Sequence, residues 1–367
     1  MSTTTVRRSQ ESDDSRAPLI RTVDSSDLSA NSEFYELKLR TKVREDHVGS
    51  DSDDDDDSLD SLLEDDASQN EDEDDEDAMA AADEGIIKLL TLVWHELPAW
   101  RQDNIFITSG YRRETLSAWK CIESLTYLHN ESVNIYSHLV GSLFFLIFLG
   151  FTLAMFLPRY ESTTGKDYAV FIIFFLGAVL CLGMSSTYHC INCHSESVAK
   201  FGNRLDYIGI ICLILGSFVP AIFYGLHALP QYMPFFFVLV GSLGIICTVV
   251  TLRPIFIDPS WRPFRALLFV AFGCSGVIPI TFGGITQGSE ELWNRVALGY
   301  MLTEGGLYIT GAAIYAARVP ERFKPGSFDL LGSSHQIFHL FVVAAAVCHL
   351  KGIINAYNFC HASRAGL

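Results

Sequence analysis

The chain has 367 residues, of which 49% are hydrophobic, yet it carries a formal net charge of −17. An apolar majority combined with so large a net charge excludes one uniform globular domain and indicates two unlike parts. An acidic chain without a glycine-rich phosphate-binding loop is also a poor candidate for a nucleic-acid-binding protein.

The net charge comes from one N-terminal tract. Residues 51–77 contain 17 Asp or Glu and no Lys or Arg, and removing these 17 from the total of 43 leaves 26, as many as the Lys and Arg. A block of like charge with few aromatic residues cannot bury enough apolar surface to fold. We therefore predict that residues 1–84 form a disordered acidic tail, which serves as a solvated spacer or recruits a basic partner.

Seven apolar stretches follow a segment, 85–130, that we predict to be helical and juxtamembrane. They cover residues 136–158, 168–189, 206–226, 231–252, 264–284, 295–317 and 335–358. Each is close to the roughly 20 residues that an α-helix needs to cross a hydrocarbon core of ~30 Å. A large soluble helical core would show polar helix faces, which these stretches lack. We predict an all-α membrane protein with a seven-transmembrane helix bundle over residues 131–367.

Basic residues in the short loops predict the orientation of this bundle. With the N-terminus in the cytosol, the inside loops and helix ends carry eight basic residues, and the outside ones carry at most five. The inside set is Lys200, Arg204, Arg253, Arg262, Arg265, Arg318, Arg322 and Lys324. We therefore predict a cytosolic N-terminus, opposite to that of a G-protein-coupled receptor, so that the acidic tail and any partner it has are cytosolic.

Polar side chains gather at the cytosolic ends of three predicted spans. His189 ends the second span, Asp206 begins the third, and a histidine pair begins the seventh. His335 and His339 are four residues apart, so both imidazoles project from one helix face. Three histidines leave the fourth position of a zinc ion open for water, which is the catalytic arrangement. Asp206 would hold that water and take its proton, and Ser185, one turn before His189, would assist as a hydrogen-bonding hydroxyl.

The segment His189–His194 (HCINCH) permits other metal chemistry. Cys190-x-x-Cys193-His194 matches a haem-attachment pattern and half of a zinc knuckle. Covalent haem attachment requires an extracytoplasmic compartment, whereas these cysteines are predicted to face the cytosol, and no second half of a knuckle follows. We therefore interpret His189 as the one ligand of this segment.

Other polar residues of the spans receive structural interpretations. Glu304 is predicted to form hydrogen bonds inside the bundle, with a proton relay as the minor alternative, and His349 is assigned to packing. The remaining polar residues near the start of the first span are predicted to make helix-entry contacts: His129, Glu131, Asn134 and His138.

Several long motifs make the chain recognisable from Leu97 onward. They are LPAWRQDN (97–104), HNESVNIYSHLVG (129–141), CHSE (193–196), LDYIGI (205–210), GSFVP (216–220), ITGAAIYAARVPERFKPGSFD (309–329) and SHQIFHLFVVAAA (334–346). In these motifs the chain resembles the progestin and adiponectin receptor family, also called the haemolysin III-related membrane proteins. It is most similar to the adiponectin-receptor-like branch, and the acidic tail and variable loops suit a fungal member.

The resemblance implies a multi-pass protein of the plasma membrane, the endoplasmic reticulum or another internal membrane, with a zinc ion on His189, His335 and His339 and with Asp206 beside the zinc-bound water. The pattern is shared with alkaline ceramidases, so it implies hydrolysis of a ceramide-like lipid amide, with that lipid or its fatty acid held in the helix bundle. Members of the family are described as hormone receptors, as ceramide hydrolases and, in fungi, as regulators of lipid, sterol and zinc homeostasis. A hydrolase, a receptor in which zinc only ties helices together, and a zinc transporter therefore remain as alternatives.

Overall fold

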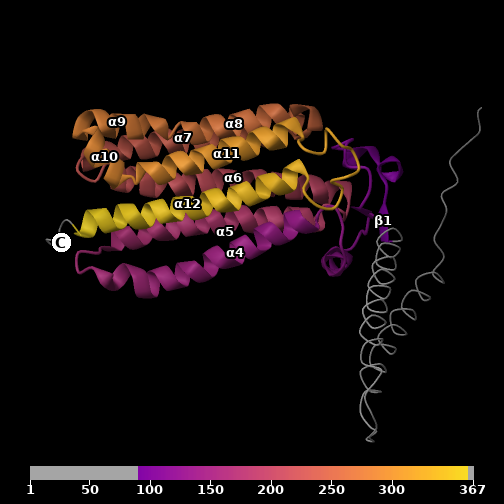
Figure 1. The fold of residues 1–367 in the computed structure, drawn as a ribbon, viewed down its shortest axis with the longest axis horizontal. Coiled ribbons are helices and arrows are strands. Elements are labelled where there is room, and N and C mark those ends of the chain that lie inside the picture. Colours follow the sequence, from indigo (N-terminus) through magenta and orange to yellow (C-terminus); the bar gives the residue numbers. More distant parts are fainter. Residues whose placement is uncertain (1–89, 363–367) are drawn as a thin grey trace, which may run out of the picture. The chain divides into compact units, whose positions relative to one another are not determined.

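A computed structural model describes residues 90–362, which form a bundle of long helices with a smaller N-terminal segment at one end (Figure 1). The tail predicted over residues 1–84 lies outside the described residues. The bundle helices are α4 (Ser132–Phe151), α5 (Gly165–Ile191), α6 (Glu196–Gly225), α7 (Met233–Thr251), α8 (Arg262–Cys274), α9 (Val277–Gln287), α10 (Ser289–Arg295), α11 (Leu298–Ala317) and α12 (Ser334–Ala362). Short turns of helix extend or join them: η4 (Thr152–Phe156), η5 (Leu157–Arg159), η6 (Pro230–Tyr232), η7 (Pro254–Ile257) and η8 (Pro259–Trp261).

The predicted spans correspond to these helices. Within residues 90–362, six helical stretches are long and apolar enough to cross a membrane: 132–159, 165–191, 196–225, 230–251, 262–287 and 334–362. The remaining predicted span, 295–317, is α11, which has 20 residues but carries Glu304 together with several Gly and Tyr residues that lower its mean hydropathy. It runs alongside α12 in the bundle (Figure 1). The all-α, multi-pass membrane fold is therefore confirmed.

Small residues allow the helices of the bundle to approach closely, as is common in membrane proteins. A Cβ atom at Gly177 of α5 would lie 2.7 Å from the carbonyl oxygen of Cys212 on α6. A Cβ atom at Gly311 of α11 would lie 2.9 Å from the Cβ atom of Phe341 on α12. Because these glycines have no Cβ atom, α5 packs closely against α6, and α11 packs closely against α12. Helices α5 and α12 both contribute to the largest apolar core.

The N-terminal segment is only partly helical. Strand β1 (Thr91–Leu92) pairs antiparallel with β2 (Tyr111–Arg112), and the helical parts are η1 (Trp94–Glu96), η2 (Ala99–Arg101), α3 (Ala118–Glu123) and η3 (Ser124–Thr126). Because Leu97, Ile107 and Tyr111 form a small apolar core of their own, the chain folds back here instead of continuing as one helix. The segment lies at the end of the bundle where α5 ends and α12 begins (Figure 1).

Helix α6 begins ten residues before the predicted span. Its first three turns are polar, with Glu196 and Lys200 forming an i,i+4 ion pair of 2.6 Å, so hydropathy alone could not detect them. Asp206 therefore lies inside α6, and the prediction that it begins the helix is wrong. The polar turns extend the helix at the end of the bundle that carries the histidines.

Candidate metal centre

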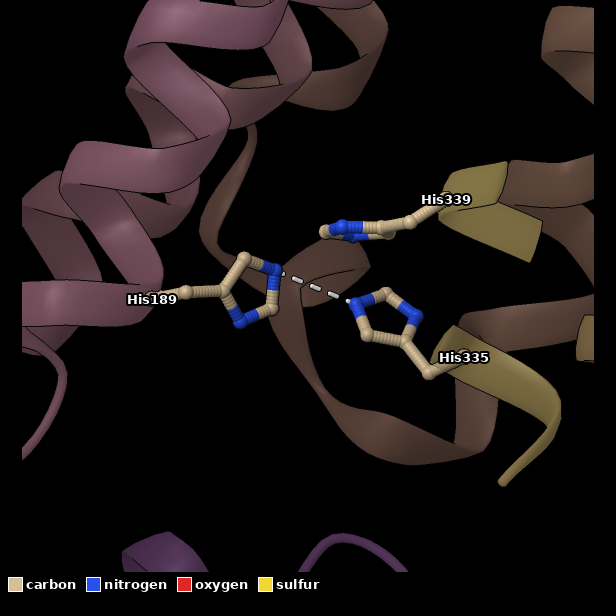
Figure 2. A group of neighbouring side chains, drawn as sticks. All are labelled: His189, His335 and His339. Carbon is tan, nitrogen blue, oxygen red and sulfur yellow. Dashed lines mark hydrogen bonds between the residues drawn. The ribbon is translucent and has the colours of Figure 1, made fainter. Parts of the chain in front are cut away.

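The three predicted histidines come together at one end of the bundle. His189 is near the end of α5, and His335 and His339 are in the first two turns of α12. Their imidazoles point toward one common centre (Figure 2), and one potential ligand atom of each lies within 4.8 Å of the others. The Nε2 atoms of His189 and His335 are 3.2 Å apart. This buried group could hold a metal ion.

Hydrogen bonds to the Nδ1 atoms of two of these histidines fix their tautomers, and so determine whether the Nε2 atoms carry a proton or a lone pair. His189 Nδ1 lies 2.7 Å from Glu131 Oε2, and His339 Nδ1 lies 3.1 Å from the carbonyl oxygen of Asn134. Since a carboxylate or carbonyl oxygen can only accept, each Nδ1 is the donor, and Nε2 of a neutral ring then carries a lone pair. His335 Nδ1 is buried and has no hydrogen-bond partner among residues 90–362. Lone pairs that converge in this way fit a cation, and imidazole nitrogen is a common ligand of zinc and other transition metals.

Glu131 is a residue of this site that sequence reasoning missed, because it was assigned to helix-entry contacts. It lies immediately before α4, and its carboxylate accepts hydrogen bonds from His189, from Asn134 Nδ2 at 2.7 Å and from Asn192 Nδ2 at 3.0 Å. Burial by itself disfavours its charged form, but the neighbouring His189 and the hydrogen bonds hold the pKa of Glu131 well below its usual range. A charged Glu131 fixes the tautomer and orientation of the His189 ring, as carboxylates behind ligating histidines do.

Arg112 holds the C-terminal end of α5, which carries His189. The side chain is 1% exposed and donates to the carbonyl oxygens of His189 at 2.5 Å and Cys190 at 2.9 Å, to Asn192 Oδ1 at 2.7 Å and to Ser124 Oγ at 2.8 Å. The last carbonyl groups of a helix have no partners within the helix, and a cation satisfies them well. Arg112 therefore positions the backbone from which His189 projects.

His138 of α4 packs against one of the three histidines. Its ring stacks on that of His339, with centroids 3.7 Å apart and an angle of 7° between the planes. The residue is buried, at 3% exposure. The stacking limits rotation of His339, so this histidine also contributes to the geometry of the triad.

Asp206 and Ser185 are the two residues predicted to take part in the chemistry. Asp206 lines a cavity of about 740 Å³ together with His189 and His335. It is not among the side chains whose ligand atoms cluster around the common centre. Ser185 lies one turn before His189 on α5, is buried at 2% exposure, and interacts through its hydroxyl with the carboxylate of Asp206. The roles of both residues stay predictions.

The other polar groups singled out in the sequence lie outside the triad. Glu304 and His349 form a buried pair between α11 and α12, with Oε2 and Nδ1 2.6 Å apart. Cys193 lies 3.5 Å from Cys121, sulfur to sulfur, and hydrogen bonding between them lowers the pKa of Cys121 to about 6. Cys193 of the HCINCH segment is therefore engaged in a hydrogen bond with Cys121, outside the histidine triad.

Comparisons with known proteins agree with this arrangement. A family model described as haemolysin-III related matches residues 126–350. The chain belongs to the haemolysin-III related family. It is 45% identical over 273 residues to the ADIPOR-like receptor IZH2 of Saccharomyces cerevisiae, and the matched region covers 73% of this chain and 84% of the relative. It is 42% identical over 282 residues to the ADIPOR-like receptor IZH1 of Eremothecium gossypii, with 75% and 88% covered.

Relatives in this family extend to plants. The chain is 36% identical over 261 residues to heptahelical transmembrane protein 1 of Arabidopsis thaliana, with 69% of this chain and 77% of the relative covered. The name of that relative agrees with the seven helical passes described above. The predicted resemblance to adiponectin-receptor-like proteins is confirmed, and the two fungal relatives support a fungal member.

Replacing Glu131 with glutamine is expected to weaken metal binding about 10- to 100-fold, the usual effect of losing the carboxylate behind a ligating histidine. The amide keeps the size of the side chain, so the fold should remain. Competition with a chelator of known affinity, monitored on the purified protein, measures this change. Glu123→Gln, an exposed acid on the neighbouring α3, is the control. An unchanged affinity in Glu131→Gln would contradict the positioning role.

Proposed function

We propose that this protein binds zinc through His189, His335 and His339 and hydrolyses a ceramide-like lipid amide within the membrane. The observation that carries the proposal is the convergence of three imidazoles, two buried and one half-buried, on one centre, beside a cavity of about 740 Å³ that Asp206 also lines. Three protein ligands are typical of catalytic zinc, whereas structural zinc usually has four. Ionisable residues inside a membrane are costly and usually functional.

Zinc bound there would act as a Lewis acid and make water a nucleophile near neutral pH. The chain supplies the surrounding functions. Glu131 and the carbonyl oxygen of Asn134 keep two of the imidazoles in the tautomer that presents Nε2. Asp206 is proposed to accept the proton of the attacking water and to pass it to the leaving amine. Ser185, whose buried hydroxyl interacts with Asp206, is proposed to donate a hydrogen bond to the carbonyl oxygen of the substrate.

We further propose that the N-terminus is cytosolic, because the loops on the side of the histidines hold more basic residues. Residues 1–84 are then a cytosolic tail able to recruit a basic partner, 85–130 a juxtamembrane segment and 131–367 the membrane domain. The protein would reside in the plasma membrane or in the endoplasmic reticulum and related membranes, where its lipid substrate or the fatty acid product occupies the bundle.

A receptor without turnover is the second candidate, since several relatives carry receptor names. In that case the metal would tie α5 to α12, because its ligands come from these two helices. A ligand would then change the relative positions of the helices without being consumed.

Release of fatty acid from ceramide by the purified, full-length protein in lipid nanodiscs separates the two candidates. The hydrolase proposal expects release above that of empty nanodiscs, loss of release after treatment with a chelator, and recovery on adding Zn²⁺. Mass spectrometry of the extracted lipids provides the measurement. A zinc-loaded preparation that releases no fatty acid from ceramide or from its phosphate ester would refute the hydrolase and leave the receptor.

A further inference from the structure

Three arginines line the cavity that contains the candidate metal site. Arg204 lies on α6, and Arg262 and Arg265 lie in the first turn of α8. Arg262 and Arg265 are 7% and 5% exposed. The Nε atom of each of the three arginines is buried and has no hydrogen-bond partner within residues 90–362. Buried donors without acceptors are costly, so an acceptor from outside the chain would stabilise this wall.

Six carboxylates also line this cavity, and two of them are already engaged near the arginines. Asp329 Oδ2 accepts from Thr108 Oγ1 at 2.9 Å and from Ser109 Oγ at 2.7 Å. Asp103 pairs with a terminal nitrogen of Arg262, which still leaves the Nε atom of that arginine without an acceptor. Arg265 also uses one terminal nitrogen, which donates to the carbonyl oxygens of Phe256 at 2.5 Å and Asp258 at 2.8 Å. The donors that remain without an acceptor on the three arginines are therefore their Nε atoms, in a cavity whose lining carries charges of both signs.

Two tyrosines connect the arginines with the candidate metal site. The Arg262 guanidinium lies over the Tyr315 ring at 4.7 Å, and that ring is 5.2 Å from the His335 ring, centroid to centroid. On the other side, the Arg265 guanidinium lies over the ring of Tyr207, the neighbour of Asp206 in the chain, at 5.3 Å. A ligand that reaches the histidines from this part of the cavity therefore lies next to the arginines.

We propose that this wall is an anion subsite that binds a phosphate group, and that the substrate of the proposed hydrolase is a lipid amide with a phosphorylated headgroup. Guanidinium groups bind phosphate oxygens with charge-assisted, often paired hydrogen bonds. Donors on two different helices suit a tetrahedral group with several acceptor oxygens better than a planar carboxylate with two. The choice of substrate rests on the proposed function, whereas the binding of phosphate does not.

Binding of phosphatidic acid to the purified full-length protein in detergent tests the subsite without any turnover. Wild type should bind phosphatidic acid at least about tenfold more tightly than phosphatidylcholine, and Arg204→Gln should lose most of that preference. Arg204 is the best position to change because it is half-exposed and its Nε atom has no partner in the described chain. Arg204→Lys should retain part of the preference, since the charge remains but the paired donors do not.

Arg159→Gln, at the opposite end of the bundle, is the matched control and should bind as wild type does. Equal affinities of wild type and Arg204→Gln for phosphatidic acid would overturn the subsite. If inorganic phosphate competes with phosphatidic acid, the phosphate group alone is sufficient for binding. If it does not compete, the site requires a phosphate group that is attached to a lipid. His189→Ala separates the two proposals, because it should lose hydrolysis but keep the binding of phosphatidic acid. If wild type binds phosphatidic acid but hydrolyses no lipid amide, the enzyme is refuted and the subsite remains.

Discussion

Asp206→Asn is expected to lower hydrolysis of the lipid amide by about 10²- to 10⁴-fold, the usual contribution of a general base. Asparagine keeps the volume of the side chain but cannot accept the proton of water. Because Asp206 is not among the side chains that cluster around the common centre, the variant should still bind zinc. Initial rates of fatty acid release, together with the zinc content of the same preparation, measure both expectations.

Asp258→Asn provides a matched control for this substitution. Asp258 also lines the cavity but is exposed and hydrogen-bonded to Ser260, so its replacement should leave the rate nearly unchanged. Wild-type rates in Asp206→Asn would contradict the proton-transfer role. A loss of zinc together with activity would instead show that Asp206 acts on the metal site.

Arg112→Ala is expected to destabilise the protein by about 3 kcal/mol or more, because removing this buried cation leaves four hydrogen-bond acceptors around the end of α5 without a donor. For a domain of this size the change corresponds to a melting temperature lower by about 6–12 °C. The acceptors include the carbonyl oxygen of His189, so metal binding should weaken as well. Thermal unfolding in one detergent, with and without added zinc, measures both effects.

Arg113→Ala is the control, since the neighbouring arginine is exposed. It should melt within about 1–2 °C of wild type, as surface substitutions usually do. A melting temperature of Arg112→Ala equal to that of Arg113→Ala would show that Arg112 does not hold the end of α5.

The membrane spans could be predicted from the sequence because mean hydropathy is a local property. The same property failed for the start of α6, where the polar turns from Glu196 to Leu205 continue the helix beyond the apolar stretch. It also could not predict the N-terminal segment, where β1 and β2 pair across 18 intervening residues. That fold depends on contacts of Leu97, Ile107 and Tyr111, which show no regular spacing.

The histidines of the candidate site could be predicted because an ionisable residue is conspicuous in an apolar span, and because His335 and His339 share one helix face. Glu131 and Arg112 could not be predicted in the same way. They lie in irregular segments, 58 and 77 residues before their partner His189, and only the fold of those segments brings them to the end of α5. The motif HNESVN contained the available signal, since it concentrates polar residues at the entry to a membrane helix.

The zinc content of purified wild-type protein and of His189→Ala, determined by inductively coupled plasma mass spectrometry, tests whether the three histidines bind zinc. We expect about one zinc per chain in wild type and a loss of most of it in the variant, because two remaining imidazoles bind zinc far more weakly than three. Lys166→Ala, at the other end of α5, should keep the metal. Wild type without zinc, or His189→Ala with the zinc content of wild type, would contradict the claim that these three histidines form a zinc site.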